Sequence, residues 1–407
     1  MSNILKVASR KFDCDVFFDC DNTVLLLPTF FSLHLSQTGQ GFAIHSYIDI
    51  NGLAQKRFML ESLSETTRNI YTNRLSQFLS WLSKYDRKNG TTLLATHNNL
   101  PAEFINKEYI DKHLCIEMEA GKSAVIHYEK SLQYYYNYLC EAKVSSYKHI
   151  HHSPKFNVTL EKNTKARTAL KYLSKSLRLF LYENANSLRD EILLRNGGEI
   201  GMRTRENLGL VLNDFVFGGK KEKGLKSLWL DMEVNKGQQA FRYLLQGKYS
   251  KGSHGKGGKS REIFIPRHLL NLYKRYFEQE RPPTGLDSLL VNNSVNAVGT
   301  PIKQNKGSYV FAGTRKIIID KQSNGKEAAD IQRLENSHTY HCLRHSFATD
   351  KFEQFCNEDN TSILEASSDS RAFLRVARLL GHSLNAKTTA RYIQLVMDKQ
   401  TIEKQAA

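Results

Sequence analysis

The spacing of apolar residues changes along the chain, and this change constrains the fold more than any other feature. Up to about Asp49, the stretches VFFDCDNTVLLL and FAIHSYIDI are alternating or continuously apolar between turn residues, which predicts strands. From Ser62 the apolar residues recur at helical spacing, as in SLSETTRNIYTNRLSQFLSWLSKYD, and residues 106–119 and 122–142 continue this pattern. The sequence therefore predicts a small strand-containing segment followed by helices.

A polar, basic stretch with one proline, VSSYKHIHHSPKFNVTLEKNTKA, occupies residues 144–166 and is typical of an interdomain linker. Beyond it, helical patterns over about 166–195 and 203–212 lead to two basic, glycine-rich turns, GGKKEKGLK and KYSKGSHGKGGKSR, beside strand-like residues. We therefore predict a mainly α fold with a small antiparallel β-sheet (α+β). The predicted parts are an N-terminal strand-containing segment (1–52), a helical domain (53–148), a linker (149–165) and a C-terminal domain (166–407).

The composition favours a polyanionic partner. With 58 Lys+Arg against 41 Asp+Glu in 407 residues, the net charge is +17, which suits DNA, RNA or an anionic membrane face. The six cysteines form no C-x-x-C pair, so we expect neither a zinc site nor disulfides, but reduced thiols in a cytoplasmic protein. The longest apolar run, 24–35, is interrupted by Pro28 and is much shorter than the roughly 20 residues of a spanning helix, so membrane insertion is not expected.

The second half of the chain holds the densest polar pattern, in four motifs: GMRTREN, GKGGKSR, HCLRHSFAT and LLGHS followed by RY. Their polar side chains are Arg203, Glu206, Lys256, Lys259, His341, Arg344, His382 and Tyr392. Arg203 is expected to open a helix with Glu206 one turn later, and His341 and Arg344 share one face of a helix.

Together these motifs resemble the tyrosine recombinases, the phage-type integrase family, in the family's order over about 190 residues. The resemblance implies a helical core-binding (SAM-like) domain over 53–148 and a tyrosine-recombinase catalytic domain over 166–407. It also implies the following roles: Arg203 as first arginine, Lys256 as hairpin lysine with Lys259 as the alternative, His341 and Arg344 as the H-x-x-R pair, His382 as second histidine and Tyr392 as nucleophile.

The chemistry of DNA cleavage fits these residue types. A tyrosine phenol can form its own phosphoester and so conserve the energy of the broken bond. Two arginines can hold the non-bridging oxygens of the phosphate, and they supply the charge that magnesium supplies elsewhere, so no metal or other cofactor is expected. His341 can move the tyrosine proton, Lys256 can protonate the leaving 5′ oxygen, and His382 can donate to a phosphate oxygen. Glu206 is expected to be a structural acceptor that orients a neighbour.

The resemblance implies a site-specific recombinase or integrase of a mobile element, acting on duplex DNA in the bacterial cytoplasm, associated with the nucleoid. It further implies a homotetramer on DNA, with the C-terminal tail IQLVMDKQTIEKQAA docking on a neighbouring protomer, and DNA-bending accessory proteins. Two alternatives stay open: a non-catalytic, sequence-specific DNA-binding protein with the same fold, and a type IB topoisomerase-like relaxase. Two departures from the family pattern are a polar insertion, NEDNTSILEASSDSR, and a slightly long spacing from His382 to Tyr392.

Two other motifs resemble known phosphate-binding or phosphatase motifs, but each lacks residues that such a site requires. GSHGKGGKS lacks the G-x-x-x-x-G-K-[ST] spacing of a P-loop and runs into a strand-like stretch. FFDCDNTV resembles the nucleophile motif of haloacid-dehalogenase-type phosphatases, which would make Asp19 the nucleophile. However, the chain has no later acidic pair to complete a magnesium site. We instead expect a turn in which Asp21, Asn22 and Thr23 form local hydrogen bonds at the end of a strand, away from DNA.

Overall fold

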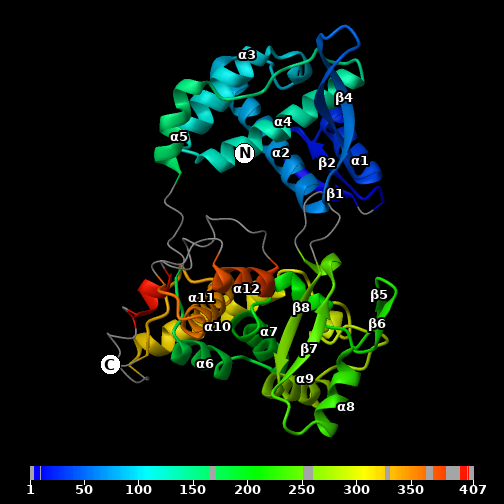
Figure 1. The fold of residues 1–407 in the computed structure, drawn as a ribbon. Helices are drawn as coiled ribbons and strands as arrows, with labels where there is room; N and C mark the ends of the chain where they lie inside the picture. The colour runs from blue at the N-terminus through cyan, green and yellow to red at the C-terminus, as the bar shows by residue number, and fades with distance from the viewer. Residues whose placement is uncertain are drawn as a thin grey trace. The chain divides into compact units, whose positions relative to one another are not determined.

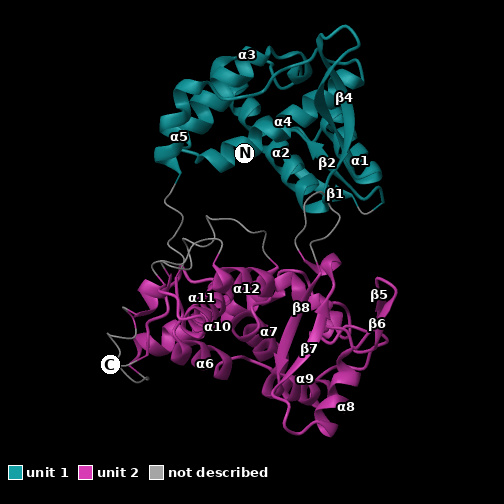
Figure 2. Ribbon diagram, viewed as in Figure 1, with its two compact units in different colours: residues 1–167 teal, residues 168–407 magenta. Residues whose placement is uncertain are grey.

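The chain forms two compact units, residues 1–167 and 168–407 (Figure 2). The computed structural model describes residues 4–9, 11–164, 171–250, 260–325, 331–363, 370–381, 395–400 and 402. Within these ranges, no helix has both the length and the apolar composition needed to cross a membrane.

Unit 1 combines two β-hairpins with a set of helices (Figure 1). The strands pair antiparallel, β1 (Leu5–Ser9) with β2 (Cys14–Phe18) and β3 (Gln40–Ile48) with β4 (Ala54–Ser62). The helices are α1 (Leu26–Thr38), α2 (Glu65–Asn89), α3 (Ala102–Phe104), the π-helix η2 (Ile105–Glu117), α4 (Lys122–Glu141) and α5 (Asn157–Asn163). The side chain of Ser64 caps α2 by accepting a hydrogen bond from the Thr67 amide at 3.1 Å.

The prediction of strands up to Asp49 is correct for β1, β2 and β3 but wrong for residues 26–38, which form α1. Pro28 lies in the first turn of this helix, where a proline costs no intrahelical hydrogen bond. Phe31, Ser32 and Leu35 are buried at helical spacing, and Gly39 ends the helix in a left-handed conformation (φ 67°). A run of leucines beside turn residues is ambiguous from the sequence, because a buried strand and a short buried helix share that composition.

The N-terminal segment and the helices of unit 1 share one core. Phe17, Phe31 and Leu35 are buried in the same cluster as Leu75 of α2 and Tyr135 of α4. The rings of Phe31 and Tyr135 meet edge to face with centroids 5.3 Å apart. Residues 1–52 therefore complete the core of the helical part.

The stretch predicted as a linker, 149–165, also packs on unit 1 as far as the structure describes it. Leu160 of α5 is buried in the unit 1 core. The Ser153 amide donates to Asp111 at 2.9 Å, and the Asn163 side chain donates to the Cys115 carbonyl at 2.8 Å. The division between the compact units falls beyond this stretch, at Arg167.

Unit 2 is mainly helical and carries two small antiparallel hairpins, β5 (Phe215–Phe217) with β6 (Lys220–Glu222) and β7 (Ala240–Leu245) with β8 (Arg261–Pro266). Its helices are α6 (Lys175–Glu183), α7 (Leu188–Glu199), the 3-10 helix η4 (Thr204–Gly209), α8 (Leu225–Val234), α9 (Arg267–Gln279), α10 (Lys306–Ser323), α11 (Tyr340–Glu358) and α12 (Arg371–Leu380). The predicted fold class, mainly α with small antiparallel sheets, is confirmed. The strand predicted for REIFIP is β8.

The packing of α7 on α11 sets the position of the polar motifs. Gly197 of α7 lies so close to Tyr340 of α11 that an added Cβ would stand 3.0 Å from the Tyr340 ring. Leu193 and Leu343 are buried in the same core. Because the two helices approach closely here, the chain that leaves the end of α7 runs directly beside α11.

A buried aromatic side chain in α1 tests whether the N-terminal segment belongs to the core of unit 1. Replacing Phe31, which is 0% exposed, by alanine should lower the free energy of unfolding by about 3–5 kcal/mol, because it leaves a cavity. The control is Phe30→Ala, since Phe30 is 48% exposed and its loss should cost within about 0.5 kcal/mol. Denaturant unfolding measures both, and equal small losses would contradict the shared core.

Candidate active site

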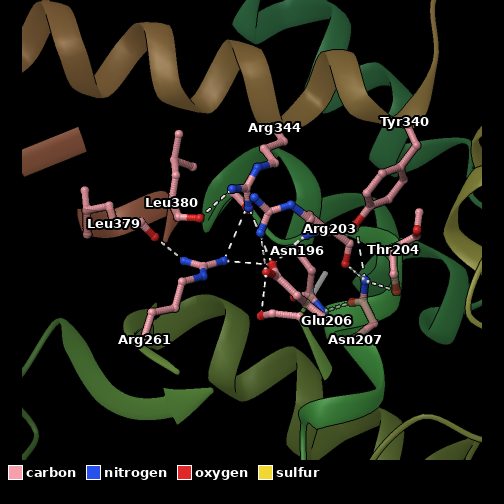
Figure 3. A network of polar contacts seen from close by, with 12 residues as sticks. Asn196, Arg203, Thr204, Glu206, Asn207, Arg261, Tyr340, Arg344, Leu379 and Leu380 are labelled. Atoms are coloured by element: carbon pink, nitrogen blue, oxygen red, sulfur yellow. Dashed lines mark hydrogen bonds and ion pairs between the residues drawn. The ribbon is translucent and has the colours of Figure 1, made fainter. Parts of the chain in front are cut away.

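The centre of the site is a carboxylate with no exposure to solvent, that of Glu206 on η4 (Figure 3). Three guanidinium groups from three different parts of unit 2 surround it. Arg203 donates to Glu206 Oε1 at 2.8 Å, Arg261 donates to Oε2 at 2.9 Å, and Arg344 lies 3.5 Å from Oε2. Ser250 Oγ completes the set by donating to Oε1 at 3.1 Å.

The local sequence GMRTREN builds this centre. Gly201 takes a left-handed conformation (φ 64°), and a Cβ there would stand 2.5 Å from Phe347, so only glycine fits. The chain then turns into η4 with Arg203 at its N-terminal cap. The Glu206 carboxylate accepts hydrogen bonds from the Arg203 backbone amide and from the Arg203 guanidinium group, each at 2.8 Å. These two bonds fix both the backbone and the side chain of Arg203.

The buried arginines give Glu206 an unusual acidity. Burial alone would raise the pKa of Glu206, but Arg261, Arg344 and Arg203 outweigh this effect and lower the pKa to about 2. The carboxylate is therefore charged at all physiological pH values. Of these four side chains, three are cations and one is an anion, so the cluster attracts a further anion.

Two of the arginines also hold the C-terminal end of α12. Arg344 Nη2 donates to the Leu380 carbonyl at 2.6 Å, and Arg261 Nη1 donates to the Leu379 carbonyl. Carbonyls at a helix C-terminus lack intrahelical partners and carry partial negative charge, so cations stabilise them. Gly381 ends the helix in a left-handed conformation (φ 62°) and packs against the Arg261 side chain.

A network of neutral polar side chains lies beneath the Arg203 turn (Figure 3). Asn196 of α7 donates to Asn207 at 2.7 Å, and Asn207 donates to the carbonyls of Arg203 and Thr204, each at 3.1 Å. The Tyr340 hydroxyl lies 3.3 Å from the Asn207 amide nitrogen. These bonds satisfy backbone groups that would otherwise be buried without partners, and they fix the turn from below.

The structure brings together two of the residues predicted for the site, Arg203 and Arg344, and joins them through Glu206, which is the structural acceptor that the sequence predicted. The Arg203 side chain remains 25% exposed, whereas that of Arg344 is 1% exposed. His341 is exposed in the first turn of α11, and its ring meets the His345 ring edge to face at 4.3 Å.

The other predicted residues, Lys256, Lys259, His382 and Tyr392, lie outside the described residues. So does most of GSHGKGGKS. Residues 395–400 are helical, and Leu395 and Val396 are buried beside Phe352 and Phe355 of α11.

The motif FFDCDNTV forms the expected turn at the end of β2. The Asp19 carboxylate accepts the amides of Asp21 at 2.9 Å and Thr23 at 2.8 Å. Asn22 takes a left-handed conformation with φ 59°. The predicted turn is thus present, and its capping side chain is that of Asp19, which binds the amides of the residues that follow it. Across the described residues, no three His, Cys, Asp or Glu side chains gather into a possible metal site.

Comparison with known proteins finds similarity in structure. No protein-family model matches the sequence, and the search of curated proteins finds no match. The XerA recombinase is 18% identical, with a TM-score of 0.34, and the match covers 84% of this chain and 92% of that chain. The Tn1549 transposon integrase in complex with circular intermediate DNA is 16% identical, with a TM-score of 0.43, covering 81% of this chain and 90% of that chain.

A third similar structure is a lambda integrase dimer bound to a COC′ core site. It is 13% identical, with a TM-score of 0.42, and the match covers 82% of this chain and 73% of that chain. These similar structures are tyrosine recombinases. The family is the one that the sequence motifs resemble.

The motifs of the sequence did not predict a role for Arg261. A signal for it exists in REIFIP, where residues alternate between the core and the surface. Arg261, Ile263 and Ile265 are buried, while Glu262 and Phe264 are exposed. An arginine in register with two core isoleucines must be buried, and a buried arginine requires an acidic partner.

The depressed pKa of Glu206 predicts how stability depends on pH. Glu206→Gln should lower the free energy of unfolding at pH 7 by about 3 kcal/mol, because it leaves buried guanidinium groups without their counter-ion. A carboxylate with a lowered pKa stabilises the fold above its unfolded value of 4.5, and this contribution is lost as the pH falls toward 2. The difference between wild type and variant should therefore shrink over that interval.

Urea unfolding at a series of pH values measures this difference. Glu262→Gln is the control, because Glu262 is half exposed and pairs with the exposed Arg242, so its loss should cost within about 0.5 kcal/mol. A loss of stability in Glu206→Gln that is the same at every pH would contradict the charge assignment.

Proposed function

We propose that this chain is a site-specific DNA recombinase or integrase of a mobile element, which cleaves and rejoins duplex DNA through a 3′-phosphotyrosine intermediate. The observation that carries the proposal is the convergence of Arg203 and Arg344, from motifs far apart in the chain, on the buried carboxylate of Glu206. Fixed guanidinium groups favour the extra negative charge of a pentavalent phosphorus.

In the proposed reaction, the phenolic oxygen of Tyr392 attacks the phosphorus, and the bond from phosphorus to the 5′ oxygen breaks. His341 accepts the phenolic proton, and Lys256 or Lys259 gives a proton to the leaving 5′ oxygen. His382 donates a hydrogen bond to a phosphate oxygen. Rejoining is the reverse step. Because the tyrosine phosphoester conserves the energy of the broken bond, the reaction as proposed uses no cofactor.

The charge of the chain supports DNA as the partner. The net charge is +17, and the site itself has more cations than anions. Binding to a phosphate backbone releases counter-ions, so the affinity of such a protein depends strongly on salt concentration.

Strand exchange between two duplexes requires four active sites, and we propose a homotetramer on DNA. Sequence analysis assigned the contact between protomers to the C-terminal tail. Leu395 and Val396 of that tail are buried in the core of their own chain, next to α11. In the proposed tetramer, docking on a neighbour would therefore use the residues beyond this contact or would require the contact to open.

The nucleophile is tested by Tyr392→Phe on nicked suicide substrates that carry DNA flanking the gene. Wild type should form a covalent adduct that resists SDS, and the variant should form none, because the phenylalanine ring has no oxygen to attack phosphorus. DNA affinity measured by gel shift should be unchanged, since the hydroxyl is a small part of the contact. Gel electrophoresis after SDS treatment measures the adduct.

Tyr309→Phe is the matched control, because Tyr309 is 65% exposed on α10 and carries no proposed role. It should form the adduct at the wild-type rate. An adduct with Tyr392→Phe would show that another residue is the nucleophile. Specific binding by wild type without any adduct would favour a non-catalytic DNA-binding protein, and relaxation of supercoils without site preference would favour a type IB topoisomerase-like relaxase.

A further inference from the structure

Arg261 connects three segments of unit 2 that carry proposed catalytic residues. It is the first residue of β8 and follows Lys256 and Lys259 closely in the sequence. One end of its guanidinium group, Nη2, donates to Glu206 at 2.9 Å, and the other end, Nη1, donates to the Leu379 carbonyl at the end of α12. From α12 the chain continues through Gly381 to His382.

We propose that Arg261 is a positioning residue, which holds the C-terminal end of α12 against the carboxylate that fixes Arg203 and Arg344. This inference rests on the proposed function, because it concerns the geometry of that same site. In this proposal Arg261 acts through the two protein acceptors that its guanidinium group binds, Glu206 and the Leu379 carbonyl.

The geometry requires an arginine at this position. The planar guanidinium group presents donors on two sides and so reaches a carboxylate and a carbonyl that lie on different elements. A lysine has a single ammonium group, which can keep the charge beside Glu206 but cannot bridge both acceptors in the same way. Lysine at this position therefore separates the electrostatic contribution of Arg261 from its bridging contribution.

The residues around Arg261 leave space for its contact with the end of α12. A Cβ at Gly381 would stand 2.9 Å from Arg261 Cδ, so the glycine that ends α12 leaves space for this side chain. Arg261 Nη2 also lies 3.4 Å from the Gly201 carbonyl, to which Arg344 donates as well. The turn before Arg203, the α12 end and the carboxylate thus share the same two guanidinium groups.

The experiment compares Arg261→Lys and Arg261→Met with wild type in the full chain. The control is Arg242→Met on β7, the strand that pairs with β8, because the Arg242 side chain is 47% exposed and its ion-pair partners are Glu222 and Glu262, outside the Glu206 cluster. Four quantities are measured for each protein: amide hydrogen exchange over residues 371–381, melting temperature, DNA affinity, and the rate of covalent adduct formation on the suicide substrate.

We expect Arg261→Lys to keep the wild-type DNA affinity and melting temperature, while the adduct forms about 10²-fold more slowly, as for a displacement of catalytic groups by about 1 Å. Amides at the end of α12 should exchange faster in Arg261→Lys and Arg261→Met, and Arg242→Met should match wild type in all four measurements. A rate that falls at constant affinity and constant melting temperature distinguishes positioning from a general loss of stability.

Hydrogen exchange distinguishes a failure of the proposed recombinase function from a failure of the proposed positioning role of Arg261. If wild type forms no adduct, the proposed function fails, but the connection between Arg261 and α12 is still tested by exchange. If Arg261→Lys exchanges at the α12 end as wild type does, the positioning role is wrong, whatever the adduct rate. If exchange rises in Arg261→Lys but the adduct rate stays at the wild-type value, α12 position does not limit the chemistry, and the inference is overturned.

Discussion

The ionic interaction between one buried carboxylate and three guanidinium groups is the constraint on which unit 2 depends. Glu206 has no solvent exposure, and a buried charge of this kind is tolerated only when its partners are close and its lone pairs are satisfied. The partners come from η4, β8 and α11, so these elements can be arranged in few other ways without leaving an unpaired charge. The hydrophobic cores stabilise the unit, whereas this cluster determines how its parts meet.

Several features could be predicted from the sequence because they depend on the chemistry of neighbouring residues or on the spacing of apolar residues. The mainly α fold with small antiparallel hairpins follows from apolar spacing. The turn after β2 follows from the tendency of an Asp side chain to accept hydrogen bonds from amides two to four residues later, as Asp19 does here. The meeting of Arg203 and Arg344 follows from a resemblance to a family, because no periodicity or spacing in one chain links positions so far apart.

Other features depend on contacts that one sequence does not reveal. Residues 26–38 form a helix because Phe31 and Leu35 fit the core that α2 and α4 provide, and this tertiary contact overrides an apolar run typical of a strand. The packing of 149–164 on unit 1 depends on acceptors such as Asp111, which is distant in sequence. Arg261 could have been recognised as buried from its register in β8, but its two acceptors lie on η4 and α12 and could not have been identified.

The hydrogen bonds of Arg203 have a consequence for ligand binding. A free arginine side chain carries about 2 kcal/mol of rotamer entropy, which it loses when an anion fixes it. The Glu206 carboxylate already holds the Arg203 guanidinium group at 2.8 Å, while a quarter of the side chain stays open to solvent. An incoming anion therefore meets a donor whose conformational freedom was lost during folding, so more of the contact energy is available as affinity.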